Sequence, residues 1–181
     1  MAKILIGIGG GIAAYKTATL ISRLVQSNHQ VDCVVTAGGL QFIAAGTLTA
    51  LCGRPPVSDT YDSRFPLGAH IELAQDAQLL IVAPATARLL ASCAMGLADD
   101  LLATLYLAVE CPVLFAPAMN TAMWEKVCVQ RHVEMLQHDG VHFVGPTSGW
   151  LSCRRQGPGR MAEPEDILAA SEEILQPQSF N

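Results

Sequence analysis

The chain has 181 residues, a formal net charge of −5 at pH 7, 51% hydrophobic residues and only 15% charged residues. This length fits one domain, no apolar stretch approaches the roughly 20 residues of a membrane span, and no basic run offers a surface for nucleic acid. The apolar composition indicates either surface buried between subunits or a single α/β domain around a buried parallel sheet.

The first half of the chain predicts alternating strands and helices. Apolar β-rich runs mark the strands, and apolar residues spaced three and four apart mark the helices. The predicted elements are a strand over 3–8, a glycine turn at 9–11, a helix over 12–26, a strand over 31–36, a helix over 41–51 ended by Gly53-Arg54-Pro55-Pro56, an irregular segment over 57–69 and a short helix over 70–77.

The second half continues the alternation. It predicts a buried strand over 79–83 closed by Pro84, helices over 87–95 and 101–109, a strand over 112–116, a helical stretch over 121–139 in one or two pieces, a strand over 141–144, a loop over 145–163 and a helix over 164–175. A structureless loop of that length is typical of an active-site lid or of a disordered segment. Residues 176–181 are expected to fray.

Strands that alternate with helices predict a single α/β domain over residues 1–175. The fold class is a Rossmann-like (flavodoxin-like) parallel sheet with helices on both faces, and the pattern leaves the strand order open.

The six cysteines form no CxxC pair and no zinc spacing, so no metal site is predicted. Most of them lie in apolar segments and are interpreted as small buried residues of a protein in the reducing cytoplasm. Cys153 differs because it stands among Gly, Pro and Arg residues in the predicted loop. It is either an incidental loop thiol or a functional one.

Asn120 lies between a predicted strand and a predicted helix, in Pro117-Ala118-Met119-Asn120-Thr121-Ala122-Met123-Trp124. Open α/β folds bind ligands at this carboxyl end of the sheet. An asparagine amide offers two donors and an acceptor, enough to hold a carboxylate without adding charge.

The glycine turn Gly7-Ile8-Gly9-Gly10-Gly11-Ile12 joins the first strand to the first helix. Glycines let the backbone approach a ligand, and the N-terminus of the following helix favours an anion. A tight β–α turn without a ligand is the competing interpretation, because the segment is not a full GxGxxG fingerprint.

Two segments carry a resemblance to a known family. Residues 117–124 match the pattern Pro-x-Met-Asn-x-x-Met-Trp in full, and residues 152–161 resemble an Ala-Cys-Gly…Gly-x-Gly-Arg-Met segment. The chain resembles the homo-oligomeric flavin-containing cysteine decarboxylase family from Lys3 to about Pro164. The resemblance is strongest to the coenzyme A branch, through Gly157-Pro158-Gly159-Arg160-Met161-Ala162-Glu163-Pro164.

The resemblance implies FMN as the cofactor and oxidative decarboxylation of a cysteine carboxylate as the activity. The implied reaction converts 4′-phosphopantothenoylcysteine to 4′-phosphopantetheine in coenzyme A biosynthesis, by oxidation to a thioaldehyde, loss of CO2 and protonation of an enethiolate. The implied assembly is a homotrimer or homododecamer with FMN between subunits, located in the cytoplasm, with a small-molecule substrate and neither nucleic acid nor membrane as a partner.

The resemblance also assigns a set of cofactor-binding residues: Gly10, Gly11, Ile12, Thr36, Thr86, Ala87, Arg88 and Ala108. Two of them depart from the family pattern. Gly11 replaces a serine that binds the flavin phosphate, so phosphate binding is expected to depend more on backbone N–H groups and Thr36. Arg88 replaces an asparagine.

Substrate binding is assigned by the resemblance to Asn120, Met119 and Met123, and catalysis to His70 and Cys153. His70 is expected to handle the proton of the oxidation step, although a lone histidine at a helix start is more often a surface or capping residue. Cys153 is expected to protonate the enethiolate.

Three arginines accompany the predicted catalytic cysteine: Arg154, Arg155 and Arg160. Arg154 replaces a family glycine, and a neighbouring cation lowers a cysteine pKa. Together the three suit a phosphate-bearing substrate, and their competing interpretation is a solvated loop.

Three other functions stay open at this point. A peptidyl-cysteine decarboxylase of a modified-peptide pathway would share the chemistry and take a peptide. A non-catalytic flavin-binding regulatory protein would keep the fold alone. A flavin prenyltransferase would share the fold but lacks the Met-Asn-x-x-Met-Trp segment and the loop cysteine.

Overall fold

A computed structural model describes residues 1–176. Five parallel strands form one sheet in the order β2-β1-β3-β4-β5, and two further strands form a separate antiparallel hairpin. The sheet strands are β1 (Lys3–Ile8), β2 (Gln30–Val35), β3 (Leu79–Ala85), β4 (Val113–Pro117) and β5 (His142–Phe143), and the hairpin strands are β6 (Thr147–Trp150) and β7 (Gln156–Arg160).

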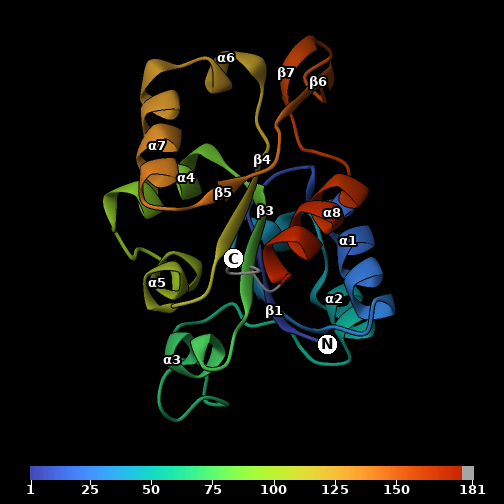
Figure 1. The fold of residues 1–181 in the computed structure, drawn as a ribbon, viewed down its shortest axis with the longest axis vertical. Helices are drawn as coiled ribbons and strands as arrows, with labels where there is room; N and C mark the ends of the chain where they lie inside the picture. Colours follow the sequence, from blue (N-terminus) through green and yellow to red (C-terminus); the bar gives the residue numbers. More distant parts are fainter. Residues whose placement is uncertain (177–181) are drawn as a thin grey trace, which may run out of the picture.

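Helices cover both faces of the sheet, as the sequence pattern predicts (Figure 1). One layer consists of α1 (Ala14–Gln26), α2 (Ala45–Cys52) and α8 (Pro164–Leu175); the other consists of α3 (Ala69–Ala74), α4 (Ala87–Met95), α5 (Leu101–Ala108) and α7 (Val127–His138). A single turn, α6 (Thr121–Trp124), precedes α7. The order β2-β1-β3-β4-β5 is the flavodoxin-like one, which settles the question that the sequence left open.

The central strands have apolar side chains on both faces because helices cover both. Every residue of β3 and β4 is buried, so alternate residues of each strand contribute to different cores. Ile81 packs with α1 and α8, whereas Leu80 and Val82 pack with α3 and α5. The apolar composition therefore includes a substantial internal contribution.

The predicted loop over 145–163 is wrong: most of it forms the β6–β7 hairpin. The segment is rich in Gly, Pro and polar residues, so it has none of the apolar alternation that identifies a strand. Its strands are nevertheless paired from Thr147↔Arg160 to Trp150↔Gln156. Figure 1 shows the hairpin standing beyond the end of the sheet, beside α6.

Other boundaries differ from the prediction as well; for example, the helix predicted over 70–77 ends at Ala74. The strand predicted to close at Pro84 continues to Ala85, which pairs with Pro117 after a register shift, while the Pro84 carbonyl accepts the Gly9 N–H. The helix predicted over 41–51 begins only at Ala45, because a turn of 3-10 helix at Gly39–Gln41 precedes it. The division of 121–139 into two helices, the ends of α4 and the ends of α8 agree with the sequence.

Among residues 1–176, none of the helices combines the length and hydrophobicity that crossing a bilayer requires. Of the predicted C-terminal tail, Gln176 follows α8, and residues 177–181 lie outside the described residues.

Candidate functional site

Two adjoining cavities lie where β1, β3 and β4 end. The larger has a volume of about 470 Å³ and is lined by the glycine turn, the Asn120 loop and the hairpin; the second has about 460 Å³ and is lined by the turn after β2 and the start of α4. Gly10, Thr86, Ala87 and Met123 line both. Carboxyl ends of parallel strands are where this fold binds ligands.

Glycines bring two loops together in the second cavity, which we call the glycine cradle. A Cβ on Gly10 would lie 2.9 Å from the backbone of Gly38, and a Cβ on Gly9 would lie 2.4 Å from the Pro84 carbonyl oxygen. Neither backbone contact can form with a larger residue, because real Cβ atoms do not come that close. The loop after β1 thus touches the loop after β2 at Gly10, and the end of β3 at Gly9, only because these positions are glycine.

Backbone N–H groups line the glycine cradle and the adjoining part of the larger cavity. No hydrogen bond within residues 1–176 uses the N–H groups of Gly10, Ile12 or Ala13 at the start of α1, nor those of Ala37 and Gly38 after β2. Donors that converge from a helix N-terminus and a glycine turn form an anion site. The glycine cradle therefore fits a phosphate group, and the larger cavity beside it has room for an apolar ring.

Thr36 lines the cradle, but its hydroxyl is already bonded within the protein. The Thr36 Oγ1 donates to the Ile8 carbonyl at 3.1 Å and accepts from the Gly39 N–H at 3.0 Å. Both bonds fix the loop that carries Ala37 and Gly38. Thr36 therefore shapes the glycine cradle rather than offering it a free hydroxyl proton.

Gly11 has room for the side chain that it lacks. A Cβ there would meet only Pro84 Cγ at 3.7 Å and Thr86 Cγ2 at 3.9 Å, which is ordinary contact. Its φ is not positive, so the backbone does not require glycine. The departure from serine at this position consequently removes a hydroxyl and leaves the local geometry unaltered.

Arg88 lies at the edge of the glycine cradle and is held there by two carboxylates. Its guanidinium donates to Asp99 Oδ2 at 2.9 Å and to Asp100 Oδ2. Asp100 also caps α5 by accepting the Ala103 N–H at 2.8 Å. The arginine therefore brings little net positive charge to the cavity, because two acidic groups surround it.

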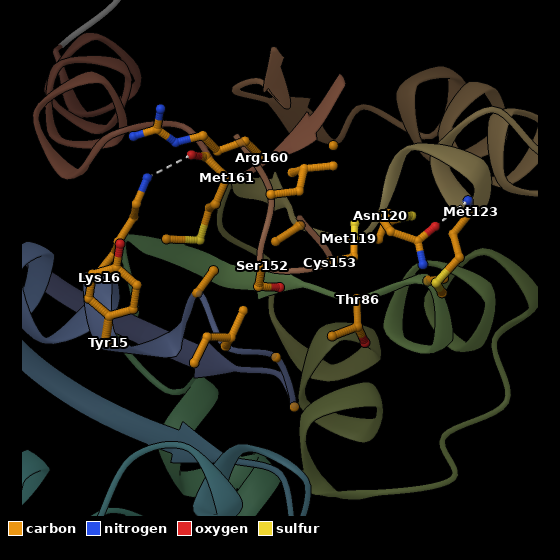
Figure 2. A pocket seen from close by; sticks show the side chains of 18 of the residues that line it. Tyr15, Lys16, Thr86, Met119, Asn120, Met123, Ser152, Cys153, Arg160 and Met161 are labelled. Atoms are coloured by element: carbon orange, nitrogen blue, oxygen red, sulfur yellow. Dashed lines mark hydrogen bonds between the residues drawn. The ribbon is translucent and has the colours of Figure 1, made fainter. Parts of the chain in front are cut away.

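Asn120 begins α6 and faces the larger cavity (Figure 2). Its Oδ1 accepts the Met123 N–H at 2.9 Å, the usual bond of an asparagine at a helix N-cap. That bond fixes the orientation of the amide, so the NH2 group is the part left for a ligand. Met119 and Met123 border it with apolar thioether side chains.

Cys153 lies at the tip of the β6–β7 hairpin and lines the larger cavity, opposite Tyr15 and Lys16 on α1 (Figure 2). The Arg154 N–H closes a turn on the Leu151 carbonyl at 2.9 Å, and the Leu151 N–H donates to the Arg155 carbonyl at 2.8 Å. Arg154 has a φ of +62°. This is the three-residue hairpin loop, in which a residue in the left-handed conformation follows a β-turn and glycine is preferred there.

The hairpin is anchored to the Asn120 loop. The Met119 N–H donates to the Gly159 carbonyl at 2.9 Å, and Thr121 Oγ1 donates to the Pro158 carbonyl at 2.8 Å. Gly159 has a φ of +122°, and a Cβ on it would lie 2.3 Å from the Met119 carbonyl oxygen. These contacts place Cys153 and Asn120 on the same cavity.

Lys16 holds the other end of the hairpin and lines the larger cavity, a position that the sequence reasoning missed. Its buried Nζ donates to the Met161 carbonyl at 3.1 Å and to Glu163 Oε1 at 2.9 Å, and Arg160 binds the same carboxylate. The hydrogen bond from Lys16 lowers the pKa of Glu163. One sequence signal could have indicated this position: Lys16 lies in the first turn of the helix that follows the glycine turn, in Gly10-Gly11-Ile12-Ala13-Ala14-Tyr15-Lys16.

Other cavity residues were not predicted either. They come from α1 and from the hairpin, whose pairing the sequence did not reveal: Ala13, Tyr15, Trp150, Leu151, Ser152 and Met161. Among the predicted cofactor residues, Gly10, Gly11, Ile12, Thr86 and Ala87 line the larger cavity, and Thr36 and Arg88 line the glycine cradle.

His70 and Ala108 are not brought to either cavity. His70 opens α3, which Figure 1 shows at the opposite end of the molecule from the hairpin. Ala108 ends α5, roughly 10 Å along the axis from Leu101, which does line the glycine cradle. The Nδ1 of His70 is buried without a hydrogen bond within the described residues.

The comparisons with known proteins agree with this geometry. Residues 1–176 match the family described as Flavoprotein. The chain is 43% identical over 177 residues to the coenzyme A biosynthesis bifunctional protein CoaBC of Vibrio vulnificus, and 40% identical over 174 residues to that of Mycobacterium tuberculosis. These alignments cover 97% and 96% of this chain but only 44% and 41% of the relatives, so the chain spans less than half of their length.

Solved structures of cysteine decarboxylases share the fold. The FMN-dependent cysteine decarboxylase SpaF is 32% identical with a TM-score of 0.84, over 97% of this chain and 98% of that one. A PPC decarboxylase mutant complexed with pantothenoylaminoethenethiol is 30% identical with a TM-score of 0.87, over 96% and 97%.

Proposed function

The chain belongs to the Flavoprotein family, and we propose that it is an FMN-dependent decarboxylase that converts 4′-phosphopantothenoylcysteine to 4′-phosphopantetheine in coenzyme A biosynthesis. One observation carries the proposal: the Asn120 amide and the Cys153 thiol face one cavity, which adjoins the glycine cradle. The relatives named for coenzyme A biosynthesis and the pantothenoyl-bound neighbour support this substrate class.

The cofactor phosphate would be held by the N–H groups of Gly10, Ile12, Gly38 and their neighbours, with Thr36 fixing the loop. Gly11, Thr86, Ala87 and Arg88 complete the surface available to FMN. FMN, when bound, supplies a two-electron oxidation of the substrate's CH2–SH group to a thioaldehyde, whose C=S bond accepts the electrons released with CO2.

The substrate carboxylate would accept hydrogen bonds from the Asn120 NH2 group. Because the Met123 N–H occupies the Asn120 oxygen, the donors are already oriented when substrate arrives. Met119 and Met123 exclude water around the carboxylate, which makes its loss as neutral CO2 easier. Arg154 and Arg155 beside the hairpin tip supply cations for a substrate phosphate.

Cys153 would protonate the enethiolate carbon; the thioaldehyde formed becomes the thiol product when it regains the two electrons that FMN, when bound, takes up in the oxidation. After CO2 leaves, the enethiolate carbon needs a proton, and the Cys153 thiol lines the cavity where that carbon forms. The anchors at Met119 and Thr121 hold the hairpin in place, so Cys153 is delivered by a fixed strand pair rather than by a flexible loop.

His70 would act in the cavity of a neighbouring copy, in a homotrimer or homododecamer. Within one chain α3 lies away from the cavity, while side chains around it are apolar and exposed: Leu67 is 71% exposed and Ile71 is 51% exposed. Such a surface is suited to contact with another subunit. Ala108, on the neighbouring helix α5, would approach FMN in the same way.

We place the enzyme in the cytoplasm, where a reducing environment keeps its six free cysteines as thiols.

The decisive experiment is anaerobic incubation with phosphopantothenoylcysteine or with a peptide that ends in cysteine, followed by mass spectrometry. Loss of CO2 from the small substrate to give a thiol supports the proposal. Turnover of the peptide alone would assign a peptidyl-cysteine decarboxylase, which the likeness to SpaF also accommodates. Binding of FMN without turnover of either substrate would instead indicate a non-catalytic flavin-binding regulatory protein.

A further inference from the structure

Two cysteines outside the cavities lie unusually close together. Cys33 is in β2, and Cys52 is the last residue of α2, which packs beside that strand. Their Sγ atoms are 3.2 Å apart. Cys33 is buried and Cys52 is partly exposed, and both are free thiols.

We propose that Cys33 and Cys52 are a redox-active dithiol that a hydroperoxide converts to an intramolecular disulfide. A disulfide bond is about 2.05 Å long, so the sulfur atoms need to approach by only about 1 Å. Small side-chain rotations suffice for that, because the sulfurs already touch. The proposal is independent of the flavin chemistry and of the decarboxylation.

The surroundings make the two sulfurs chemically unequal. The hydrogen bond from Cys33 lowers the pKa of Cys52, and the nearby Arg54 guanidinium acts in the same direction against burial and the Asp32 charge. Sharing that hydrogen bond, together with burial, raises the pKa of Cys33. Cys52 therefore has the lower pKa of the two thiols and is the more accessible sulfur, and both properties favour it as the reactive cysteine.

The surroundings of the pair favour thiol chemistry. Within residues 1–176 no group of three or more His, Cys, Asp or Glu side chains is arranged to hold a metal ion. The neighbouring Asp32 carboxylate instead binds Arg54 at 3.0 Å and Gln30 at 3.3 Å. Two sulfurs in contact, without further ligands, point to thiol–disulfide chemistry.

The reaction balances with the hydroperoxide as the oxidant. The Cys52 thiolate attacks the outer peroxide oxygen, the O–O bond breaks, and the alkoxide leaves as the alcohol after taking a proton, so Cys52 becomes a sulfenic acid. Cys33 then attacks the Cys52 sulfur and expels water, after giving up its thiol proton. In total the two thiols lose two electrons and two protons, and the peroxide is reduced to alcohol and water.

The disulfide would close the segment between β2 and α2, which carries Thr36 and Gly38 of the glycine cradle. A cavity of about 260 Å³ lined by Cys33 and Arg54 lies beside the pair, and Cys52 is itself partly exposed, so a small oxidant reaches the attacking sulfur from solvent. Oxidation would thus constrain the chain on which the cradle is built, without touching Asn120 or Cys153.

The test begins with the purified full-length protein. It is exposed to tert-butyl hydroperoxide, the remaining thiols are alkylated, and the peptides are mapped by mass spectrometry without reduction. We expect a Cys33–Cys52 cross-link that dithiothreitol reverses, and the same cross-link in Cys128→Ser, a control at an exposed cysteine elsewhere. If Cys33 and Cys52 are both alkylated, and so remain thiols, under conditions that oxidise Cys153, the proposal is overturned. A disulfide between either of them and another cysteine would overturn it as well.

Single variants test the order of events. Cys33→Ser should leave a sulfenic acid on Cys52 that dimedone labels, whereas Cys52→Ser should leave Cys33 unlabelled. Cys33→Ala serves the same purpose if serine is not tolerated at this buried position. Dimedone labelling of Cys33 in the Cys52→Ser variant would overturn the assignment of Cys52 as the attacking sulfur. The cross-linking experiment on the unmodified protein tests the disulfide even if none of these variants folds.

Discussion

The side-chain oxygen of Asn120 accepts the backbone N–H of Met123 at 2.9 Å. One side chain thus caps the short helix α6 with its oxygen and leaves its NH2 group facing the cavity. The capping role and the proposed carboxylate-binding role use different atoms. Substitutions can therefore separate them.

Asn120→Asp should abolish decarboxylation while the protein stays folded. Aspartate keeps the capping oxygen, so the helix start is preserved. It replaces the donor by a negative charge, and two unit charges about 4 Å apart interact by about 4 kcal/mol at an effective dielectric of 20. Turnover with phosphopantothenoylcysteine and the thermal melting curve measure the two effects; near-normal turnover would remove Asn120 from the site.

Asn120→Ala is the matched variant, because it removes both functions. It should lose activity and also about 1 kcal/mol of unfolding free energy through the missing cap. Equal stability of the Ala and Asp variants would show that the cap contributes nothing.

Gly11→Ser should tighten FMN binding. The position has room for a Cβ, and a hydroxyl added there, in the larger cavity next to Gly10 of the glycine cradle, would donate to the phosphate. A hydrogen bond to a charged group contributes about 1.5–3 kcal/mol, so the dissociation constant should fall about tenfold or more. Gly10→Ser is the control and should weaken FMN binding, because its Cβ would lie 2.9 Å from the Gly38 backbone. Fluorescence titration of apoprotein with FMN measures both.

Arg154→Gly should stabilise the hairpin. Arg154 occupies the left-handed region with a φ of +62°, which costs a non-glycine residue about 1–2 kcal/mol, partly offset by the greater chain entropy of glycine. A gain of up to about 1 kcal/mol in unfolding free energy is expected. Arg155→Gly makes the same charge change at a residue without a positive φ, so it should give no gain. A gain of the same size in both variants would attribute the effect to charge rather than to backbone strain.

Much of this fold could be predicted because its strands are buried on both faces and appear as continuous apolar runs. The hairpin could not, because β7 consists of Gln156, Gly157, Pro158, Gly159 and Arg160. Backbone contacts to Met119 and Thr121 hold this strand, and such contacts leave no pattern of apolar residues in a single sequence.

The site residues also divide into those that the sequence could predict and those that it could not. Asn120 and Cys153 could be found because each lies in a motif, and the structure places both on one cavity. Lys16 was missed because a lysine within a helix normally faces solvent, whereas this one is buried against the Met161 carbonyl. The separation of His70 from the cavity could not be predicted, since a motif gives no information on where the fold places a residue relative to the cavity.

Stability should fall in acid because of Glu163. The hydrogen bond from Lys16 holds its pKa below the ordinary value of 4.5 in the folded state. The carboxylate therefore adds stability above that value, and the contribution is lost as the pH falls through the folded pKa. Urea denaturation midpoints between about pH 6 and pH 3 should drop less in Glu163→Gln than in the unmodified protein. Parallel curves for the two would contradict a role for this ion pair in acid sensitivity.

Inactive variants of His70 and Cys153 should complement each other if the site is shared between copies. His70→Asn should leave substrate untouched, and Cys153→Ser should release CO2 but yield the enethiol, because a hydroxyl is a far weaker acid than a thiol of pKa about 8.5. Co-expressed variants of a homo-oligomer would form mixed oligomers, and α3 lies at the opposite end of the molecule from the hairpin. In some of these, a native His70 from one copy meets a native Cys153 from another.

The fully reduced thiol product, followed by mass spectrometry, should then reappear in the mixture although neither variant makes it alone. A mixture that forms mixed oligomers yet makes no thiol would show that one chain supplies both residues, and a Cys153→Ser protein with normal thiol output would make Cys153 an incidental thiol.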